Sequence, residues 1–277
     1  MSELKGKRAL VTGASSGIGA AIALELARRG VHLVLAARRR LQLDDVAAVC
    51  AKHGVATEVI TADLGTPRGA RTLWTAATKT SLDILVNNAG FGYFRPFTEI
   101  DWARDAELVQ LNITSLVELS RLFVDHRKDR RGRAYLMNVA SIGAYQSVPN
   151  MALYSASKAF VRNFTEALHD EFRGTQLSAT CISPGGTKTN FHAMAGAGNY
   201  SWLANRSMMT AEDVALLAVD AMERGKRNVI PGFMNKLSCW GVRFVPRWLA
   251  SWVSRRVLGK PRPGELPART AEGESAA

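Results

Sequence analysis

Short, continuous apolar runs alternate with longer amphipathic stretches along most of the chain. Continuous apolar runs are typical of strands that are buried on both faces of a parallel sheet. The stretches between them carry apolar residues at helical spacing, and two of them end at Gly30 and Gly54, as helices often do. The pattern predicts strands at 8–12, 32–37, 55–61, 84–86, 134–139, 178–182 and 228–230. It predicts helices at 18–27, 41–53, 67–79, 101–126, 151–173 and 211–224.

This alternation predicts an α/β fold: a single Rossmann-type, doubly wound domain whose parallel sheet of about seven strands carries helices on both faces. We assign residues 1–235 to this domain because no linker-like composition interrupts them. We predict that residues 236–258 form a basic, amphipathic helical extension, which Pro246 divides into two short helices. Residues 259–277 contain three prolines, three glycines and few apolar side chains, so we expect a disordered tail.

Charge is concentrated in the C-terminal part of the 277-residue chain. Lysine and arginine number 36 against 24 acidic residues, a net charge of +12, and residues 224–262 hold ten basic residues and no acidic one. Because the rest of the chain is nearly neutral and carries no nucleic-acid-binding motif, we expect no nucleic-acid partner. Three cysteines are too few for a disulfide scaffold, and the metal-binding spacings CxxC and HExxH do not occur.

Two apolar rows run along residues 236–258 at spacings of three and four. One row is Leu237, Trp240, Phe244, Trp248 and Trp252, and the other is Val245, Leu249, Val253 and Val257. A basic, tryptophan-rich stripe can contact a membrane surface, pack on its own domain or form a dimer interface, and the sequence leaves these open. Without an apolar leader or a spanning run we expect a cytoplasmic protein, with peripheral contact to the inner membrane face as an option. We also expect a homodimer or homotetramer.

The glycine-rich turn TGASSGIG at 12–19 lies between the first predicted strand and helix. Such a turn lets backbone N–H groups approach a pyrophosphate at a helix N-terminus. The second strand ends in alanines where an acidic residue would bind a ribose 2′-hydroxyl, and Arg38, Arg39 and Arg40 follow. Guanidinium groups favour a 2′-phosphate, so we predict NADP(H) over NAD(H) with Arg38 as the main contact. Arg40 is expected to be solvated, and Arg39 could be either.

Tyr154 and Lys158 are four residues apart on a predicted helix and share one face. An adjacent ammonium group favours the phenolate and lowers the tyrosine pKa toward the range useful for proton transfer. Ser141 follows strand 134–139, at the sheet edge where ligands bind, and Asn112 lies inside a helix, where asparagine is disfavoured. Asn112 is either part of this constellation or a structural residue, at a helix kink or as a packed amide.

The order and spacing of seven motifs resemble the short-chain dehydrogenase/reductase superfamily, in its short single-domain branch, over residues 5–235. These motifs are TGASSGIG at 12–19, Asp63-Leu64, NNAG at 87–90, Asn112, Ser141, YSASK at 154–158, and Pro184-Gly185 with Thr189. One departure is Thr187, where the family often has valine or isoleucine; it leaves only a packing detail open.

The resemblance implies roles for individual residues. Tyr154 would be the general acid/base, Lys158 would lower its pKa and bind the nicotinamide ribose, and Ser141 would hold the carbonyl oxygen. Asn112 would position a water in a proton relay, Asp63 would contact adenine and Asn88 would brace the sheet. Further cofactor contacts are expected at Gly13, Ser15, Ser16, Gly17, Ile18, Gly19, Leu64, Ala89, Gly90, Pro184, Gly185, Thr187 and Thr189.

The substrate side is rich in aromatic residues and methionine, which suits an apolar, adaptable pocket. The candidates are Phe191, His192, Met194, Tyr200, Trp202, Leu203, Met208 and Met209, facing Phe91, Ala144, Tyr145 and Val148. We therefore predict an NADP-dependent carbonyl reductase or alcohol dehydrogenase for a hydrophobic ketone or secondary alcohol, fatty-acyl or steroid-like. The alternative is a non-catalytic dinucleotide-binding scaffold or sensor, which would have no need of Asn112, Ser141, Tyr154 and Lys158 together.

Overall fold

The computed structural model describes residues 2–187 and 208–259 and contains a seven-stranded, wholly parallel sheet in the order β3-β2-β1-β4-β5-β6-β7. The predicted Rossmann-type fold is thereby confirmed, and the predicted strand ends lie within two residues of the observed ones. The strands are β1 (Arg8–Thr12), β2 (His32–Ala37), β3 (Thr57–Thr61), β4 (Ile84–Asn87), β5 (Ala134–Val139), β6 (Leu177–Ile182) and β7 (Asn228–Val229).

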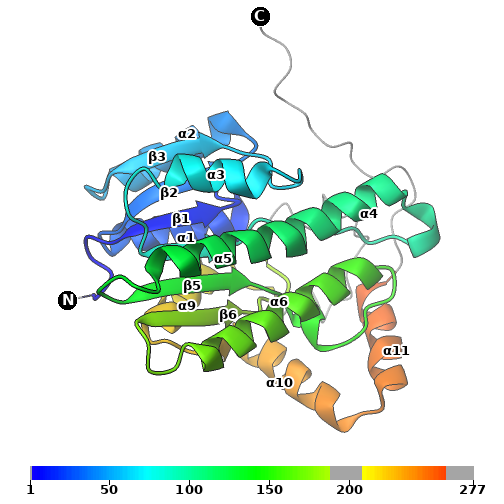
Figure 1. Cartoon of the computed structure of the whole chain (residues 1–277). Helices are drawn as coiled ribbons and strands as arrows, with labels where there is room; N and C mark the ends of the chain where they lie inside the picture. Colours follow the sequence, from blue (N-terminus) through cyan, green and yellow to red (C-terminus); the bar gives the residue numbers. More distant parts are fainter. Residues whose placement is uncertain (1, 188–207, 260–277) are drawn as a thin grey trace, which may run out of the picture.

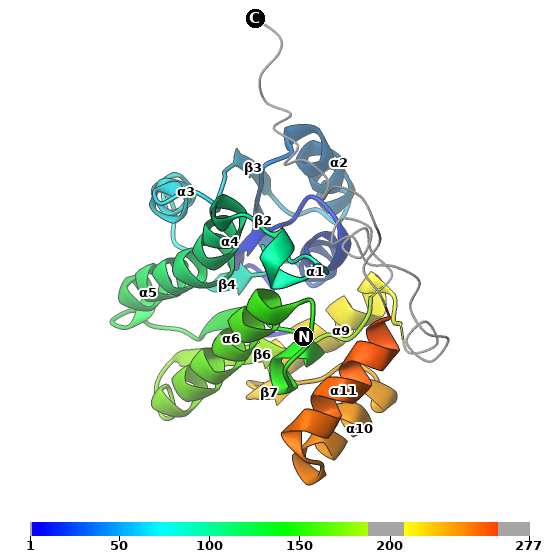
Figure 2. The same cartoon turned by 90° about the vertical axis from the view of Figure 1, so that its right-hand side faces the viewer.

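Helices cover both faces of the sheet (Figures 1 and 2). On one face lie α1 (Gly17–Arg28), α2 (Arg40–Ala51) and α9 (Ala211–Glu223). On the other lie α3 (Gly69–Ala77), α4 (Trp102–Val109), α5 (Leu116–Arg127) and α6 (Ala152–Glu171). Each helix buries one apolar stripe: Ile22 and Leu26 of α1, for example, are fully buried beside Val11 and Leu35 of the sheet. Burial of such a side chain contributes roughly 1.5–3 kcal/mol.

The long helix predicted at 101–126 is interrupted. A π-helical turn, Gln110–Ser115, joins α4 to α5. One tertiary and one local hydrogen bond hold this turn: Ser115 Oγ donates to the Leu64 carbonyl at 2.7 Å, and Gln110 Nε2 donates to Ser115 Oγ within the turn at 3.1 Å. Turns of this kind inside α-helices are frequent at functional sites, and this one carries Asn112 into the interior.

The C-terminal extension forms a helical hairpin beyond the β7 edge of the sheet (Figures 1 and 2). Its first helix, α10 (Phe233–Gly241), begins three residues before the predicted boundary at 236, and a 3₁₀ turn, Val242–Phe244, follows. Pro246 immediately precedes α11 (Arg247–Leu258), as predicted. Within the described ranges, no helix combines the length and apolarity needed to cross a membrane. The tail from 260 onward lies outside the described residues, and so do residues 188–207 with Thr189.

Candidate active site

A continuous cleft of about 900 Å³ runs along the carboxyl ends of the strands, from the glycine turn to the C-terminal hairpin. Open parallel sheets bind ligands at this edge. The predicted site residues that line it are Gly13, Ser15, Ser16, Gly17, Ile18, Arg38, Asp63, Leu64, Asn88, Ala89, Gly90, Ser141, Tyr154, Lys158, Pro184, Gly185 and Thr187. Gly19 and Asn112 are buried outside its lining. The cleft thus brings together one end suited to a dinucleotide and one end with apolar walls.

The glycine turn is built so that only glycine fits at two of its positions. Gly13 has φ +66°, and a Cβ on Gly19 would lie 2.3 Å from the Gly13 carbonyl oxygen. Asn88 clamps the turn to the sheet, because its Nδ2 donates to the carbonyls of Thr12 at 3.0 Å and Gly13 at 3.3 Å. The bare backbone at the N-terminus of α1 therefore forms a cradle that fits the pyrophosphate of a dinucleotide.

The three arginines after β2 have three different environments. Arg39 Nη2 donates to Ser15 Oγ at 3.2 Å and Ser16 Oγ at 3.0 Å, so this side chain lies directly on the glycine turn. Arg38 also lines the cleft, with Nη1 3.7 Å from Glu107 Oε1. Arg40 is absent from the cleft lining and pairs with Asp44 one helical turn on, at 2.8 Å.

Ser141, Tyr154 and Lys158 converge on one wall of the cleft. Ser141 follows β5, and its side chain is hydrogen-bonded to that of Tyr154 on α6. Lys158, one turn further along α6, is buried; its Nζ lies 5.9 Å from the centre of the Tyr154 ring and donates to the Val139 carbonyl at 2.8 Å. A hydroxyl pair beside an ammonium group is able to bind a carbonyl oxygen and to exchange a proton with it.

Burial opposes the charged forms of both titratable groups. It raises the pKa of Tyr154, which the hydrogen bond from Ser141 partly offsets, and it lowers the pKa of Lys158 to about 8. In this arrangement the Lys158 ammonium bonds to a backbone carbonyl rather than to the phenol. The effect of Lys158 on the pKa of Tyr154 remains a prediction.

Asn112 is a fully engaged amide. Its Nδ2 donates to the Phe91 carbonyl at 2.9 Å and to Ser157 Oγ at 3.1 Å, and its Oδ1 accepts from the Phe91 N–H at 3.1 Å. These bonds tie the loop after β4 to the π-helical turn and to α6. The geometry supports the structural interpretation, a packed amide within the π-helical turn, and the relay role stays a prediction.

A family model for short chain dehydrogenases matches residues 7–199. The chain belongs to the short chain dehydrogenase family. The resemblance inferred from the motifs is therefore confirmed, and the glycine turn, the Ser141 wall and the YxxxK helix lie within the matched region.

Relatives of this short chain dehydrogenase are similar over most of its length. An uncharacterized oxidoreductase of Myxococcus xanthus is 36% identical over 197 residues, which cover 70% of this chain and 77% of the relative. The 11-beta-hydroxysteroid dehydrogenase-like 4A of Arabidopsis thaliana is 31% identical over 267 residues, 94% of this chain and 85% of the relative. A solved short-chain dehydrogenase from Sphingobium yanoikuyae, in complex with NADPH, superposes with a TM-score of 0.76 at 29% identity, covering 86% of this chain and 94% of that one.

The far end of the cleft is apolar. Phe91, Tyr145 and Val148 line it as predicted, whereas Ala144 is buried and does not, because its side of the turn faces the core. Met208 lines the cleft and Met209 does not; the other predicted loop residues lie outside the described ranges. The second apolar row of the C-terminal hairpin completes the wall, through Val245, Leu249, Val253 and Val257.

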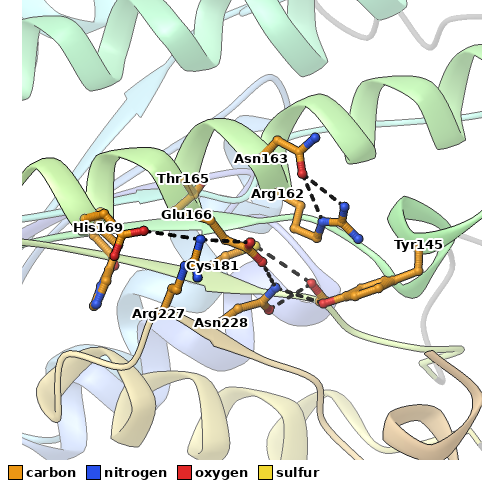
Figure 3. A network of polar contacts seen from close by, with 12 residues as sticks. Tyr145, Arg162, Asn163, Thr165, Glu166, His169, Cys181, Arg227 and Asn228 are labelled. Carbon is orange, nitrogen blue, oxygen red and sulfur yellow. Dashed lines mark hydrogen bonds and ion pairs between the residues drawn. The ribbon is translucent and has the colours of Figure 1, made fainter. Parts of the chain in front are cut away.

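Tyr145 is held in place by a polar network that sequence reasoning missed (Figure 3). Asn228 Nδ2 donates to the Tyr145 hydroxyl at 2.8 Å and to Glu166 Oε1 at 2.6 Å. The Arg162 guanidinium lies 4.4 Å from the centre of the Tyr145 ring. These partners come from α6 and β7, distant in sequence from Tyr145, so no local pattern identifies them.

Gly92 is a second residue that sequence reasoning missed. A Cβ at this position would lie 2.4 Å from Cδ2 of Tyr154, so the backbone of the loop after β4 packs directly on the tyrosine ring. The available signal was a glycine two residues beyond the NNAG motif, which often marks a close backbone approach.

Gly92→Ala is therefore expected to displace the Tyr154 ring and to lower kcat about tenfold or more, while NADPH binding is retained. Steady-state rates and fluorescence titration with NADPH measure the two effects. Gly241→Ala is the control, because Gly241 has helical backbone with φ −60° and its added methyl group meets nothing within 4 Å. A wild-type kcat for Gly92→Ala would contradict the assigned contact.

The described residues contain no group of three or more histidine, cysteine, aspartate or glutamate side chains able to hold a metal ion. The cysteines, Cys50, Cys181 and Cys239, are all buried and unpaired with one another. Cys239 lines the hairpin end of the cleft.

Proposed function

We propose that this short chain dehydrogenase interconverts a hydrophobic ketone and a secondary alcohol with NADP(H), and that Tyr154 exchanges the proton. One observation carries the proposal: Ser141, Tyr154 and Lys158 meet on the cleft wall between a dinucleotide cradle and an apolar pocket. The name of the Arabidopsis relative, a hydroxysteroid dehydrogenase-like protein, supports an apolar substrate.

The residues at the wall act on the substrate oxygen. The hydroxyls of Ser141 and Tyr154 would donate hydrogen bonds to the carbonyl oxygen and so orient it. As negative charge develops on that oxygen, the phenol proton of Tyr154 moves to it, and the Lys158 ammonium stabilises the phenolate that remains. The bound dinucleotide supplies or accepts the hydride. In the reverse direction the phenolate accepts the alcohol proton.

The preference for NADP(H) is supported by the end of β2. Ala36 and Ala37 place no carboxylate there, and Arg38 and Arg39 both line the cleft beside the glycine turn. A solved relative binds NADPH. Since Arg39 contacts the turn itself and Arg38 is shared with Glu107, we assign the 2′-phosphate to both guanidinium groups rather than to Arg38 alone.

Arg38→Ala and Arg39→Ala are each expected to raise the KM for NADPH about tenfold and to leave the KM for NADH nearly unchanged, because only the 2′-phosphate loses a partner. Initial rates with the two cofactors measure this. Arg40→Ala is the matched control, since Arg40 pairs with Asp44 away from the cleft. Equal effects of Arg38→Ala on both cofactors would refute the assignment.

The substrate class is tested by screening NADPH oxidation against aliphatic, steroidal and acyl ketones. Turnover of apolar ketones, with little activity on small charged ones, is the expected outcome. NADPH binding without turnover of any of them would favour the scaffold or sensor instead. The homodimeric or homotetrameric state and the cytoplasmic location stay predictions.

A further inference from the structure

The outer surface of the C-terminal hairpin exposes an unusual amount of apolar area. Nine of the sixteen large hydrophobic side chains exposed among the described residues belong to residues 233–253. We use the name outer face for the six of them that do not line the cleft: Phe233, Leu237, Trp240, Phe244, Trp248 and Trp252. Exposed apolar patches of this kind mark interaction sites.

Helical spacing separates the outer face from the cleft on both helices. On α11, Trp248 and Trp252 lie one turn apart and are exposed by 71% and 51%, whereas Ala250 and Ser254 are buried toward the cleft. On α10, Asn235 and Cys239 are buried in the same way, opposite Leu237 and Trp240. The hairpin therefore has two apolar sides. One side forms a wall of the pocket, and the other faces solvent.

Basic residues alternate along the hairpin with the residues of the outer face. Exposed basic residues are spread along the hairpin at Lys236, Arg243, Arg247, Arg255 and Arg256. The Arg256 guanidinium lies 4.8 Å from the centre of the Trp252 ring. No acidic residue occurs between 224 and 262. The apolar aromatic side chains suit the boundary between headgroups and acyl chains of a bilayer. The basic residues beside them suit anionic headgroups. A two-fold dimer through the same face would instead bring two sets of cations together.

The rim of the cleft connects the two sides. Met234, Val245 and Val253 are exposed and also line the cleft. Gln146, next to Tyr145, donates a hydrogen bond to Ser254 of α11, which joins the hairpin to the catalytic half of the wall. Met234, Val245 and Val253 therefore give the hairpin an apolar rim between the outer face and the pocket.

We propose that the outer face binds the surface of an anionic lipid bilayer, and that the substrate is a bilayer-dissolved ketone or alcohol that enters the cleft across the Met234–Val245–Val253 rim. The second half of this proposal, the entry route of the substrate, rests on the proposed function. The first half, the contact with the bilayer, does not. The lipid contact would hold the mouth of the cleft at the membrane and raise the local concentration of an apolar substrate.

Vesicle binding tests the first half without substrate or cofactor. The full-length protein is expected to float with phosphatidylcholine–phosphatidylglycerol vesicles, less with phosphatidylcholine alone, and less again at high salt. The double variant Trp248→Asp/Trp252→Asp should lower the partition coefficient about tenfold or more. Trp102→Asp is the matched control, since Trp102 is 79% exposed on α4, outside the hairpin. Failure of the wild type to bind anionic vesicles would overturn the proposal. So would a double variant that changes only the dimer–monomer balance, which would assign the face to a second copy.

Turnover tests the second half. The double variant is expected to lose about tenfold in kcat/KM for a long-chain ketone supplied in vesicles and to keep wild-type kcat/KM for a short, water-soluble ketone. Equal losses on both ketones would overturn the entry route. If no protein turns over either ketone, the proposed function fails, while the vesicle result still decides the docking. A thermal melt equal to that of the wild type establishes that the exposed substitutions leave the fold intact.

Discussion

Tyr154→Phe is expected to lower kcat for ketone reduction about 10³-fold while the affinity for NADPH changes little. The phenol is the proton source in the proposed reaction, and Ser141 cannot replace it because an aliphatic hydroxyl is a far weaker acid than a phenol. The phenylalanine ring keeps the packing against Gly92, so the cleft should retain its shape. NADPH consumption under saturating substrate gives kcat, and quenching or enhancement of NADPH fluorescence gives the affinity.

Tyr145→Phe is the natural control for this substitution. Tyr145 lines the same cleft, but its hydroxyl is engaged by Asn228 and not by the catalytic wall. Its loss should change kcat by less than about tenfold, with the larger effect on KM for the ketone. A Tyr154→Phe enzyme that turned over at the wild-type rate would remove Tyr154 from the chemistry and return the scaffold interpretation.

The fold could be predicted from sequence because its signals are local. Apolar runs such as His32–Ala37 and Ala134–Val139 coincide with β2 and β5, since strands buried on both faces are mostly apolar. The π-helical turn could not be predicted. Apolar periodicity continues through 101–126, and the extra residue is held by Ser115 bonding to Leu64, a contact across 51 residues.

In the candidate site, too, local features could be predicted and contacts between distant segments could not. Residues whose geometry is set within one turn or one helix, such as Gly13, Gly19, Tyr154 and Lys158, could be proposed from their spacing together with the family resemblance. Contacts between distant segments could not. The packing of Gly92 on Tyr154 and the bonding of Asn228 to Tyr145 depend on how loops meet above the sheet.

The C-terminal segment shows a further limit. Spacing predicted two apolar rows but could not distinguish their surroundings, because both rows are apolar and recur at helical spacing. Packing of α11 against the cleft makes Leu249 and Val257 part of the pocket and leaves Trp248 and Trp252 in solvent. The alternatives of packing and surface contact therefore apply to different sides of one hairpin.

Lys158→Met is expected to change both activity and the pH dependence of stability. Burial holds the pKa of Lys158 at about 8 in the folded chain, against 10.5 for a free lysine. Below pH 8 both states carry the proton, and the folded state bears the whole penalty of a buried ammonium group. Between pH 8 and 10.5 the unfolded chain binds more protons, so this group's contribution to the free energy of unfolding rises with pH. The pKa difference corresponds to about 3 kcal/mol.

The stability of Lys158→Met relative to the wild type should therefore fall by about 3 kcal/mol between pH 7 and pH 10.5, while kcat is about 10²-fold lower throughout. Urea unfolding of the cofactor-free proteins at a series of pH values measures the difference, in which the titration of tyrosines and cysteines common to both proteins cancels. Lys52→Met, at an exposed lysine after α2, should give a flat difference. A flat difference for Lys158→Met as well would mean that burial does not disfavour the ammonium form. The Lys158 charge would then be available to Tyr154 at no expense to the fold, and the activity of this wall would not be traded against its stability.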